Sequence, residues 1–200
     1  MKKLSLIAII FVLLSFTTQA QDIRFGIKGG VSSDASLLNN LDDLDNVFWG
    51  YQAGILVDLN YFGPVSLQPE VLFSSRGDKY ASNGFNVEEN LKYIDVPVLI
   101  KLRPLPILNV YAGPQVSFLV KGEYEYALAG SSTKVDNRDA FNKFDYGFAA
   151  GAGLDLGGFM IDLRYMMGFN EIAKDGMIND IVLDNDAKNR SLQLSVGFLF

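Results

Sequence analysis

Apolar and polar residues alternate along most of the chain with a period of two positions. Near the end of the chain, Leu192, Leu194 and Val196 share one face of an extended strand, and Ser191 and Gln193 share the other. This period is typical of β-strands with one apolar face. The alternation recurs in eight segments, which are residues 23–32, 49–60, 65–74, 93–103, 108–119, 144–156, 159–169 and 190–200.

The links between these segments are of two kinds. Residues 61–64, 104–107 and 157–158 are too short for anything but tight turns. Four longer loops are expected at residues 33–48, 75–91, 121–143 and 170–189. Short turns at one end and long loops at the other are the plan of outer-membrane barrels. The pattern therefore predicts an all-β fold: an eight-stranded antiparallel transmembrane up-and-down β-barrel with short periplasmic turns and long extracellular loops.

The composition of the two faces indicates which one meets lipid. The apolar face carries no charged residue, and a charge at the bilayer midplane would cost about 2–4 kcal/mol. The polar face is rich in glycine, which suits a narrow barrel interior. Its charges nearly balance, as buried charges must. The predicted lumen charges are Arg24, Lys28, Asp58, Glu70, Asp95, Lys101, Arg103, Asp145, Asp155, Asp162 and Arg164.

Strand order predicts how some of these charges group. Seven map near the turn end: Arg24, Lys101, Arg103 and Arg164 with Asp58, Asp155 and Asp162. Arg164 is expected to reach the neighbours of Asp162, or Glu70 across the bore. We interpret the set as a structural salt-bridge network that plugs the bore, because side chains fill an eight-stranded barrel.

Aromatic residues and prolines add two further expectations. Aromatic residues near both ends of the strands resemble interfacial girdles: Trp49, Tyr51, Phe73, Phe118, Phe144 and Tyr146 on the loop side, and Phe25, Phe62, Phe159 and Phe198 on the turn side. Three prolines, Pro69, Pro97 and Pro114, fall inside strands and each removes a ladder donor. We expect β-bulges at all three.

The first twenty residues have the features of a secretory signal peptide. Lys2 and Lys3 precede an apolar run, and small residues before Gln21 suit cleavage near Ala20. Cleavage would leave residues 21–200 as one barrel domain and make the formal net charge of −6 two units more negative. An acidic chain argues against nucleic acid as a partner. The absence of Cys and His removes thiolate catalysis, the commonest general base and the commonest metal ligand.

Two motifs resemble ligand sites but lack the spacing that such sites need. Residues 151–158 resemble a dinucleotide fingerprint, but Leu156 stands where the third glycine is needed and no crossover helix follows. Residues 42–46 and 179–186 are acidic, yet their spacing matches no EF-hand. We therefore predict no cofactor, no metal site and no enzymatic activity, and treat the acidic loops as solvated surface. The alternatives for these loops are calcium binding by their carboxylates, coverage of the barrel mouth and contact with an external partner.

Several segments together resemble the PorT-like outer-membrane β-barrel proteins, often called the porin family. The carriers are residues 25–32, 67–77, 93–102, 110–120, 144–169 and 197–200. The resemblance covers residues 21–200 and implies an outer-membrane barrel in a Gram-negative cell. A final alternating strand that ends in Phe198 and Phe200 also resembles the signal read by the outer-membrane barrel assembly machinery. We expect that strand to pair with residues 23–32 and close the sheet.

These observations leave three functional hypotheses. The first is a non-enzymatic structural or surface-interaction barrel in outer-membrane lipid, whose loops contact an extracellular or envelope protein. The second is a narrow channel, or a component of a transport or secretion assembly. The third is a soluble exported binder of lipocalin type, whose apolar side chains would point inward.

Overall fold

The computed structural model describes residues 22–34, 49–77, 79–82, 85–128, 131–136, 142–171 and 188–200. The signal-peptide prediction and both acidic loops lie outside these residues. The strands are β1 (Asp22–Asp34), β2 (Trp49–Phe62), β3 (Val65–Arg76), β4 (Lys79–Ser82), β5 (Phe85–Leu102), β6 (Leu108–Leu128), β7 (Ser131–Asp136), β8 (Phe144–Leu156), β9 (Phe159–Glu171) and β10 (Lys188–Leu199). Among the described residues, no helix is long and apolar enough to cross a membrane.

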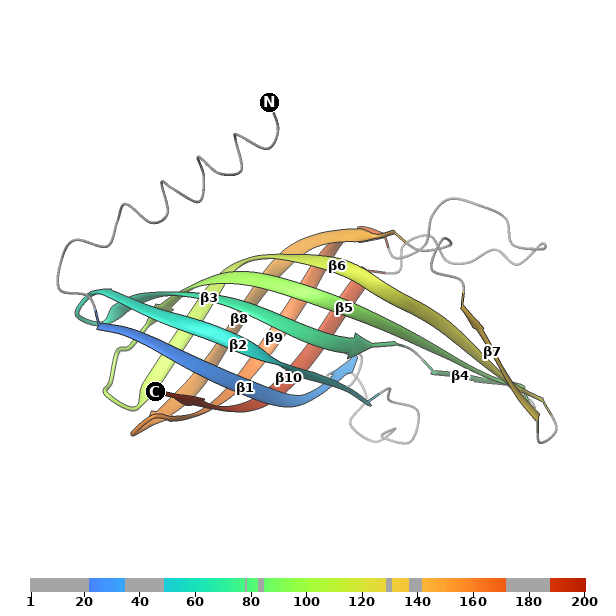
Figure 1. The fold of residues 1–200 in the computed structure, drawn as a ribbon, viewed down its shortest axis with the longest axis horizontal. Coiled ribbons are helices and arrows are strands. Elements are labelled where there is room, and N and C mark those ends of the chain that lie inside the picture. Colours follow the sequence, from blue (N-terminus) through green and yellow to red (C-terminus); the bar gives the residue numbers. More distant parts are fainter. Residues whose placement is uncertain are drawn as a thin grey trace, which may run out of the picture.

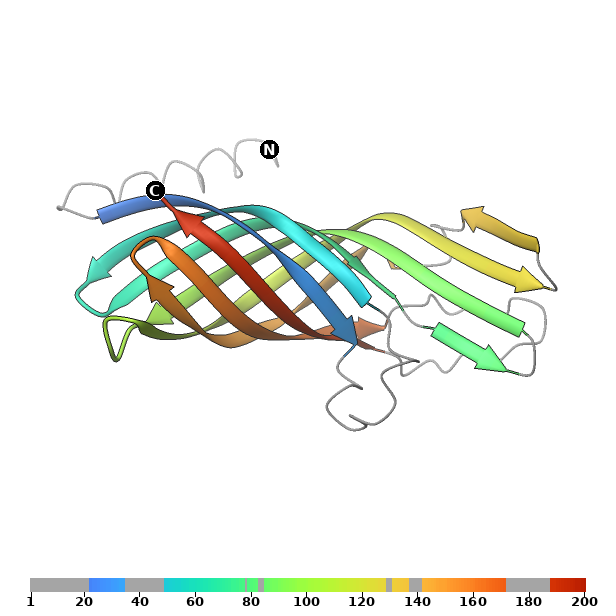
Figure 2. The same cartoon turned by 90° about the horizontal axis from the view of Figure 1, so that it is seen from below.

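Eight of the strands form a closed antiparallel barrel, as the alternation predicted (Figures 1 and 2). The order around the ring is β1, β2, β3, β5, β6, β8, β9, β10 and back to β1. The β1–β10 ladder runs from Asp34 opposite Ser191 to Gly26 opposite Leu199. Beyond it, the N–H of Phe200 donates to the carbonyl oxygen of Phe25 at 2.8 Å. The predicted pairing of the last strand with the first is confirmed.

The three predicted short turns are confirmed and lie together at one end of the barrel (Figure 1). β2 and β3 are joined through Gly63, which has a φ of 53°. β8 and β9 are joined through Gly157 and Gly158, which have φ values of 63° and 103°. Positive φ at both central residues is the requirement of a type I′ hairpin turn.

At the opposite end, two of the four predicted loops are partly wrong. The segments predicted as loops 75–91 and 121–143 contain β4, β7 and the outer parts of β5 and β6. β5 and β6 run for 18 and 21 residues, well past the other strands, and carry β4 and β7 on their outer sides (Figure 2). We call this four-stranded outer part the extended sheet. Asn-Gly at positions 83–84 is a strong hairpin signal that the prediction overlooked, because the flanking residues lack a continuous apolar face.

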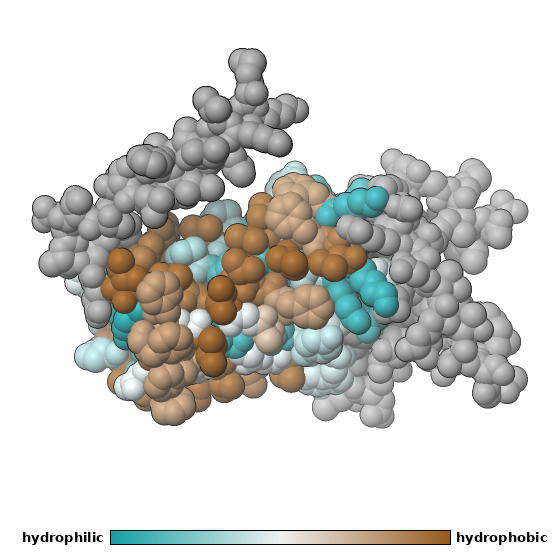
Figure 3. All heavy atoms as spheres, viewed as in Figure 1, coloured by the Kyte–Doolittle hydropathy of each residue, from teal (hydrophilic) through white to brown (hydrophobic). Residues whose placement is uncertain are grey.

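The assignment of the two faces is confirmed. Apolar side chains cover the outside of the barrel wall, as Figure 3 shows, and include Ile55 at 60%, Ile100 at 61% and Val196 at 61% exposure. The inner face is buried, and most of its residues are polar. It also contains apolar clusters that the sequence alone does not indicate: Leu56 with Met160 and Leu199, Leu99 with Tyr111 and Ala149, and Leu91 with Tyr93 and Leu119. These side chains fill space that the charged groups leave.

Aromatic rings meet in pairs at both ends of the outer surface, as the predicted girdles require. On the loop side, the centroids of Phe118 and Phe144 are 5.5 Å apart, and those of Tyr51 and Phe73 are 6.3 Å apart. On the turn side, the ring of Phe198 lies 4.9 Å from that of Phe159. The side chain of Phe62 lies outside the described set.

The prediction of β-bulges at the three prolines is wrong. The β3–β5 register has the same offset on both sides of Pro69 and Pro97, and the β6–β8 ladder passes through Pro114 without a shift. Near Pro69 and Pro97 the ladder instead skips positions and resumes in the same register. A missing N–H removes one hydrogen bond without adding a residue, so the strands stay aligned.

The inward glycines are required mainly by the neighbouring strand rather than by the lumen. A methyl group on Gly54 would lie 2.0 Å from the carbonyl oxygen of Val71, and one on Gly113 would lie 2.0 Å from that of Val98. These contacts are shorter than any real Cβ contact. Glycine therefore permits the close approach of neighbouring strands in a tightly curved wall.

Candidate functional site

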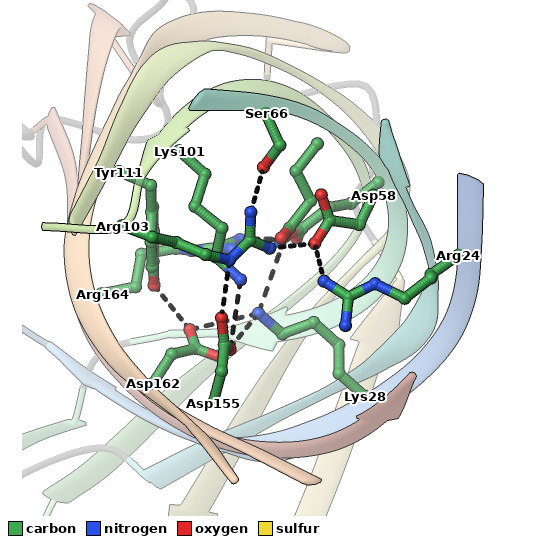
Figure 4. Close-up of polar contacts among 12 residues, drawn as sticks. Arg24, Lys28, Asp58, Ser66, Lys101, Arg103, Tyr111, Asp155, Asp162 and Arg164 are labelled. Carbon is green, nitrogen blue, oxygen red and sulfur yellow. Dashed lines mark hydrogen bonds and ion pairs between the residues drawn. The ribbon is translucent and has the colours of Figure 1, made fainter. Parts of the chain in front are cut away.

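Nine of the eleven predicted lumen charges form two clusters in the half of the bore nearest the turns. The turn-end cluster consists of Arg24, Asp58, Ser66, Lys101, Arg103 and Asp155 (Figure 4). Arg24 Nη2 lies 3.1 Å from Asp58 Oδ2, and Arg103 Nη2 donates to the same oxygen. Arg103 Nε donates to Asp155 Oδ2 at 3.1 Å, and Lys101 Nζ lies 3.4 Å from Asp155 Oδ1. Arg103 thus links two carboxylates that come from β2 and β8.

The mid-bore cluster lies one layer further from the turns and consists of Lys28, Gln68, Glu70, Tyr111, Asp162 and Arg164. Arg164 donates to both oxygens of Glu70, at 2.9 and 2.8 Å. Lys28 Nζ lies 3.0 Å from Asp162 Oδ2 and 3.7 Å from Glu70 Oε1. The hydroxyl of Tyr111 donates to Asp162 at 2.6 Å.

The mid-bore cluster spans the barrel from wall to wall. Glu70 belongs to β3 and Arg164 to β9, and these two strands are not neighbours in the ring. Both side chains have 0% exposure. A bidentate guanidinium–carboxylate pair fixes both partners in orientation as well as distance. The pair therefore acts as a cross-brace through the centre of the lumen.

The structure divides the predicted group of seven charges between the two clusters. Asp162 and Arg164 belong to the mid-bore cluster rather than to the turn end. β9 begins at Phe159, so every second residue along it places an inward side chain further from the turns. Asp162 stands opposite Gly153 on β8, and Gly153 is two positions further from the turns than Asp155.

The two remaining predicted charges lie toward the loop end. Asp95 Oδ2 accepts hydrogen bonds from Arg76 Nη2 at 2.5 Å and from Ser74 Oγ at 2.6 Å. The guanidinium of Arg76 also lies 4.9 Å from the centroid of the Tyr93 ring. Asp145 Oδ1 accepts a hydrogen bond from the backbone N–H of Asn170 at 3.2 Å.

Sequence reasoning missed several members of this arrangement. Tyr111 and Gln68 stand at inward positions of predicted strands, so the alternation itself could have found them. Arg76 stands beyond the predicted end of its strand, where the polar composition suggested a loop. Ser66 Oγ accepts a hydrogen bond from Arg103 Nη1 at 3.0 Å. Ser66 is uncharged, so a search for charged lumen residues does not include it.

The chemistry open to these clusters is limited. Every carboxylate in them is hydrogen-bonded to a cationic or hydroxyl group, so none stands as an isolated acid or base. Within the described ranges, no group of three or more His, Cys, Asp or Glu residues is arranged to hold a metal ion. The arrangement suits mechanical bracing of the wall.

Comparison with known proteins gives one family match. Residues 19–174 match the model of a family described as the outer membrane protein beta-barrel domain. A search of curated proteins finds no match.

Several solved structures have a similar course of the chain at low identity. The attachment invasion locus protein Ail of Yersinia pestis, in complex with the heparin analogue sucrose octasulfate, is 15% identical with a TM-score of 0.48, over 91% of this chain and 100% of that one. Neisserial surface protein A is 13% identical with a TM-score of 0.45, over 90% of this chain and 98% of that one. A major outer membrane protein from Thermus thermophilus is 16% identical with a TM-score of 0.49, over 89% of this chain and 99% of that one.

Proposed function

Because the chain belongs to the outer membrane protein beta-barrel domain family, we propose that this integral outer-membrane protein is a non-enzymatic surface-interaction barrel. Its extended sheet presents a binding surface to an extracellular or envelope protein, while side chains close its bore. The extended sheet is the observation that carries the proposal, since strands that long are unnecessary for crossing a bilayer. The PorT-like assignment is part of the same proposal.

The extended sheet offers both faces and edges to a partner. Its register places Lys79, Glu88, Glu125 and Lys134 in one row across four strands. Successive rows belong to opposite faces of a sheet, so this charged row alternates with less polar rows. Within the described strands, β4 pairs only with β5 and β7 only with β6. Such an edge can accept an extended segment of another chain.

The two charge clusters support a closed bore. Four buried groups of the mid-bore cluster meet near the barrel axis, and the turn-end cluster adds a second layer. Apolar side chains fill the space between them, as with Leu56, Met160 and Leu199. An eight-stranded barrel has an interior just wide enough for its own side chains. Every carboxylate of the two clusters is hydrogen-bonded to a cationic or hydroxyl group, and this supports a non-enzymatic role.

A second candidate function is a narrow channel, or a component of a transport or secretion assembly. One observation favours it. Inward polar atoms are buried without a hydrogen-bond partner along the whole bore, among them Gln52 Oε1 and Gln193 Oε1 toward the loop end and Asp58 Oδ1 at the turn end. Such atoms suit contact with water or a small solute along the bore.

Planar-bilayer recording separates the two candidates. A closed bore predicts no stable large conductance from the purified full-length protein, whereas a pore for hydrated ions or sugars gives steady open-channel current. The Glu70→Gln variant tests whether the cross-brace contributes to closing the bore, because this substitution weakens the pair of Arg164 and Glu70 and leaves the outer surface unchanged. Steady large conductance of the unaltered protein would overturn the closed-bore proposal.

Partner capture tests the surface role. We suggest replacing residues 79–88 and 124–135 each by an Asn-Gly turn, which leaves the paired residues Glu123 and Asp136 beside the new turn. A protein that cross-links to the full chain in intact cells should be lost from this shortened variant. Heat-modifiable gel migration verifies that the shortened barrel still folds. Equal cross-linking by both forms would contradict a role for the extended sheet.

A further inference from the structure

Polar atoms without a hydrogen-bond partner are concentrated in the bore. Among the described residues, eleven side-chain nitrogen and oxygen atoms are buried without such a partner, and we call them the orphaned atoms. They belong to Arg24, Gln52, Asp58, Asn60, Gln68, Arg76, Asp95, Asn109, Arg164 and Gln193, with two nitrogens from Arg76. All ten residues stand at inward positions of their strands, so the orphaned atoms belong to the lumen.

The orphaned atoms follow the bore from one end to the other. At the turn end, Arg24 Nε and Asp58 Oδ1 belong to the turn-end cluster. In the middle, Gln68 Oε1 and Arg164 Nε belong to the mid-bore cluster. Toward the loop end, the residues that carry orphaned atoms are Gln52, Arg76, Asp95 and Gln193. Orphaned atoms therefore lie on both sides of the cross-brace and beside it.

Buried polar atoms that stay unpaired are costly to a folded protein. Each gives up its hydrogen bond to water on folding and gains none in return. Native proteins contain only a few such atoms per hundred residues, and each requires an explanation. The combined penalty of eleven dry atoms would match or exceed the whole stability of an ordinary domain. The folded barrel therefore needs a bonding partner along its bore.

The chemistry of the orphaned atoms identifies this partner as water. Seven of them are carboxylate or amide oxygens, which accept hydrogen bonds, and four are arginine nitrogens, which donate them. An ion of either sign would satisfy only one of these two sets, whereas a water molecule both donates and accepts. The interior of an eight-stranded barrel is also too narrow for a hydrated ion or a sugar.

We propose that the bore passes water in single file and excludes hydrated ions and sugars. Water advances by exchanging hydrogen bonds between successive orphaned atoms, each of which offers a bond that the protein leaves unfilled. The long glutamine and arginine side chains that carry several of these atoms change rotamer to admit a molecule as small as water. The cross-brace of Arg164 and Glu70 stays in place and blocks larger solutes.

The water path goes beyond the surface role proposed above and does not rest on it. It gives the narrow-channel candidate a definite solute, and it agrees with a bore that is closed to hydrated ions. The surface role depends on the extended sheet, whereas the water path depends on the barrel lumen. Loss of cross-linking and loss of water flux are therefore separate results, and each proposal fails on its own experiment.

Stopped-flow light scattering of proteoliposomes measures the water permeability of the full-length protein. Vesicles placed in sucrose should shrink faster with the protein than without it, in proportion to the protein content, and should then stay shrunken because sucrose does not enter. The double variant Gln52→Leu, Gln193→Leu replaces two orphaned oxygens by apolar groups. Its excess permeability should fall by about tenfold, because passing water loses two hydrogen-bond acceptors.

Val98→Leu is the matched control, because it places a leucine on the outer wall, where Val98 is 37% exposed. This variant should keep the water permeability of the unaltered protein. The absence of excess permeability in the unaltered protein would overturn the proposal, as would an unchanged double variant or an equal fall in the control. Vesicles that regain volume in sucrose, or a steady ionic current, would refute a path selective for water. Gel migration verifies folding, and Gln193→Leu alone replaces the double variant if that one does not fold.

Discussion

At the scale of single residues, the cross-brace between Arg164 and Glu70 joins two strands on different sides of the bore. Both side chains are fully buried, and two hydrogen bonds of 2.9 and 2.8 Å join them. Removing one partner of such a pair leaves an uncompensated buried charge. We therefore predict that Arg164→Ala lowers the free energy of unfolding by about 3–5 kcal/mol, measured by denaturant titration in lipid vesicles.

Two further variants test the physical reason for this loss. Arg24→Ala removes a cation whose side chain is 33% exposed, and the buried Asp58 carboxylate keeps its hydrogen bond from Arg103, so a much smaller loss is expected. The double variant Glu70→Gln, Arg164→Met removes both charges and should be more stable than Arg164→Ala alone. If Arg164→Ala left the free energy of unfolding unchanged, the bracing role would be contradicted.

The orientation of the faces gives a second prediction at this scale. Val98 is 37% exposed on the outer wall, and Gln193 is buried at 2% inside. Val98→Arg should destabilise the folded barrel in bilayers by about 2–4 kcal/mol, the cost of a cation on the lipid face. Vesicle unfolding titrations measure it, with Val98→Leu as the neutral control. A harmless Val98→Arg together with a severe Gln193→Leu would mean that the faces are reversed.

At the scale of elements, the curvature of the wall depends on where neighbouring strands approach. Gly54→Ala would place a methyl group 2.0 Å from the carbonyl oxygen of Val71, so β2 and β3 must separate. We expect a loss of about 1–3 kcal/mol in the free energy of unfolding, as for other overpacked sites. Gly29→Ala is the matched control on the outer face, because its nearest contact would be an ordinary 3.6 Å from Gln52. Equal stability of the two variants would refute the close-approach argument.

At the scale of the whole molecule, closure joins the two ends of the described barrel. Phe200 exchanges backbone hydrogen bonds with Phe25, at 2.8 and 3.3 Å, and its ring lies 6.5 Å from that of Phe198. We predict that Phe200→Ser lowers the amount of protein in the outer membrane while refolding in detergent stays efficient, because the ladder bonds remain and only the proposed assembly signal is lost.

Phe25→Ser is the control for this prediction. Phe25 is also an exposed aromatic residue at the turn end, and its backbone pairs with Phe200, but it is not part of the proposed signal. Membrane fractionation and quantitative blotting compare the variants. Similar outer-membrane amounts for Phe200→Ser and the unaltered protein would remove Phe198 and Phe200 from the assembly proposal.

The strands of the barrel wall, the turns, the lipid-facing surface and the closure of the barrel all follow from the order of residues along the chain. These features are local or periodic: a period of two assigns each residue to a face, Gly157–Gly158 marks a type I′ turn, and an edge in lipid would leave backbone groups unpaired. The inward location of all eleven predicted charges follows from the same period. Even Glu70 as a partner of Arg164 could be proposed from strand order.

Which charges meet, and how far the strands continue, depends on the folded chain. Contacts across a bore depend on the stagger between strands, which no single segment encodes, so strand order alone places Asp162 and Arg164 one layer too near the turns. Beyond the bilayer no lipid enforces an uninterrupted apolar face, so the outer parts of β5 and β6 alternate only over short stretches, such as residues 123–126, and the prediction assigned them to loops. Pro69 and Pro97 interrupt hydrogen bonds without shifting register, because the neighbouring pairs on both sides hold the strands in line.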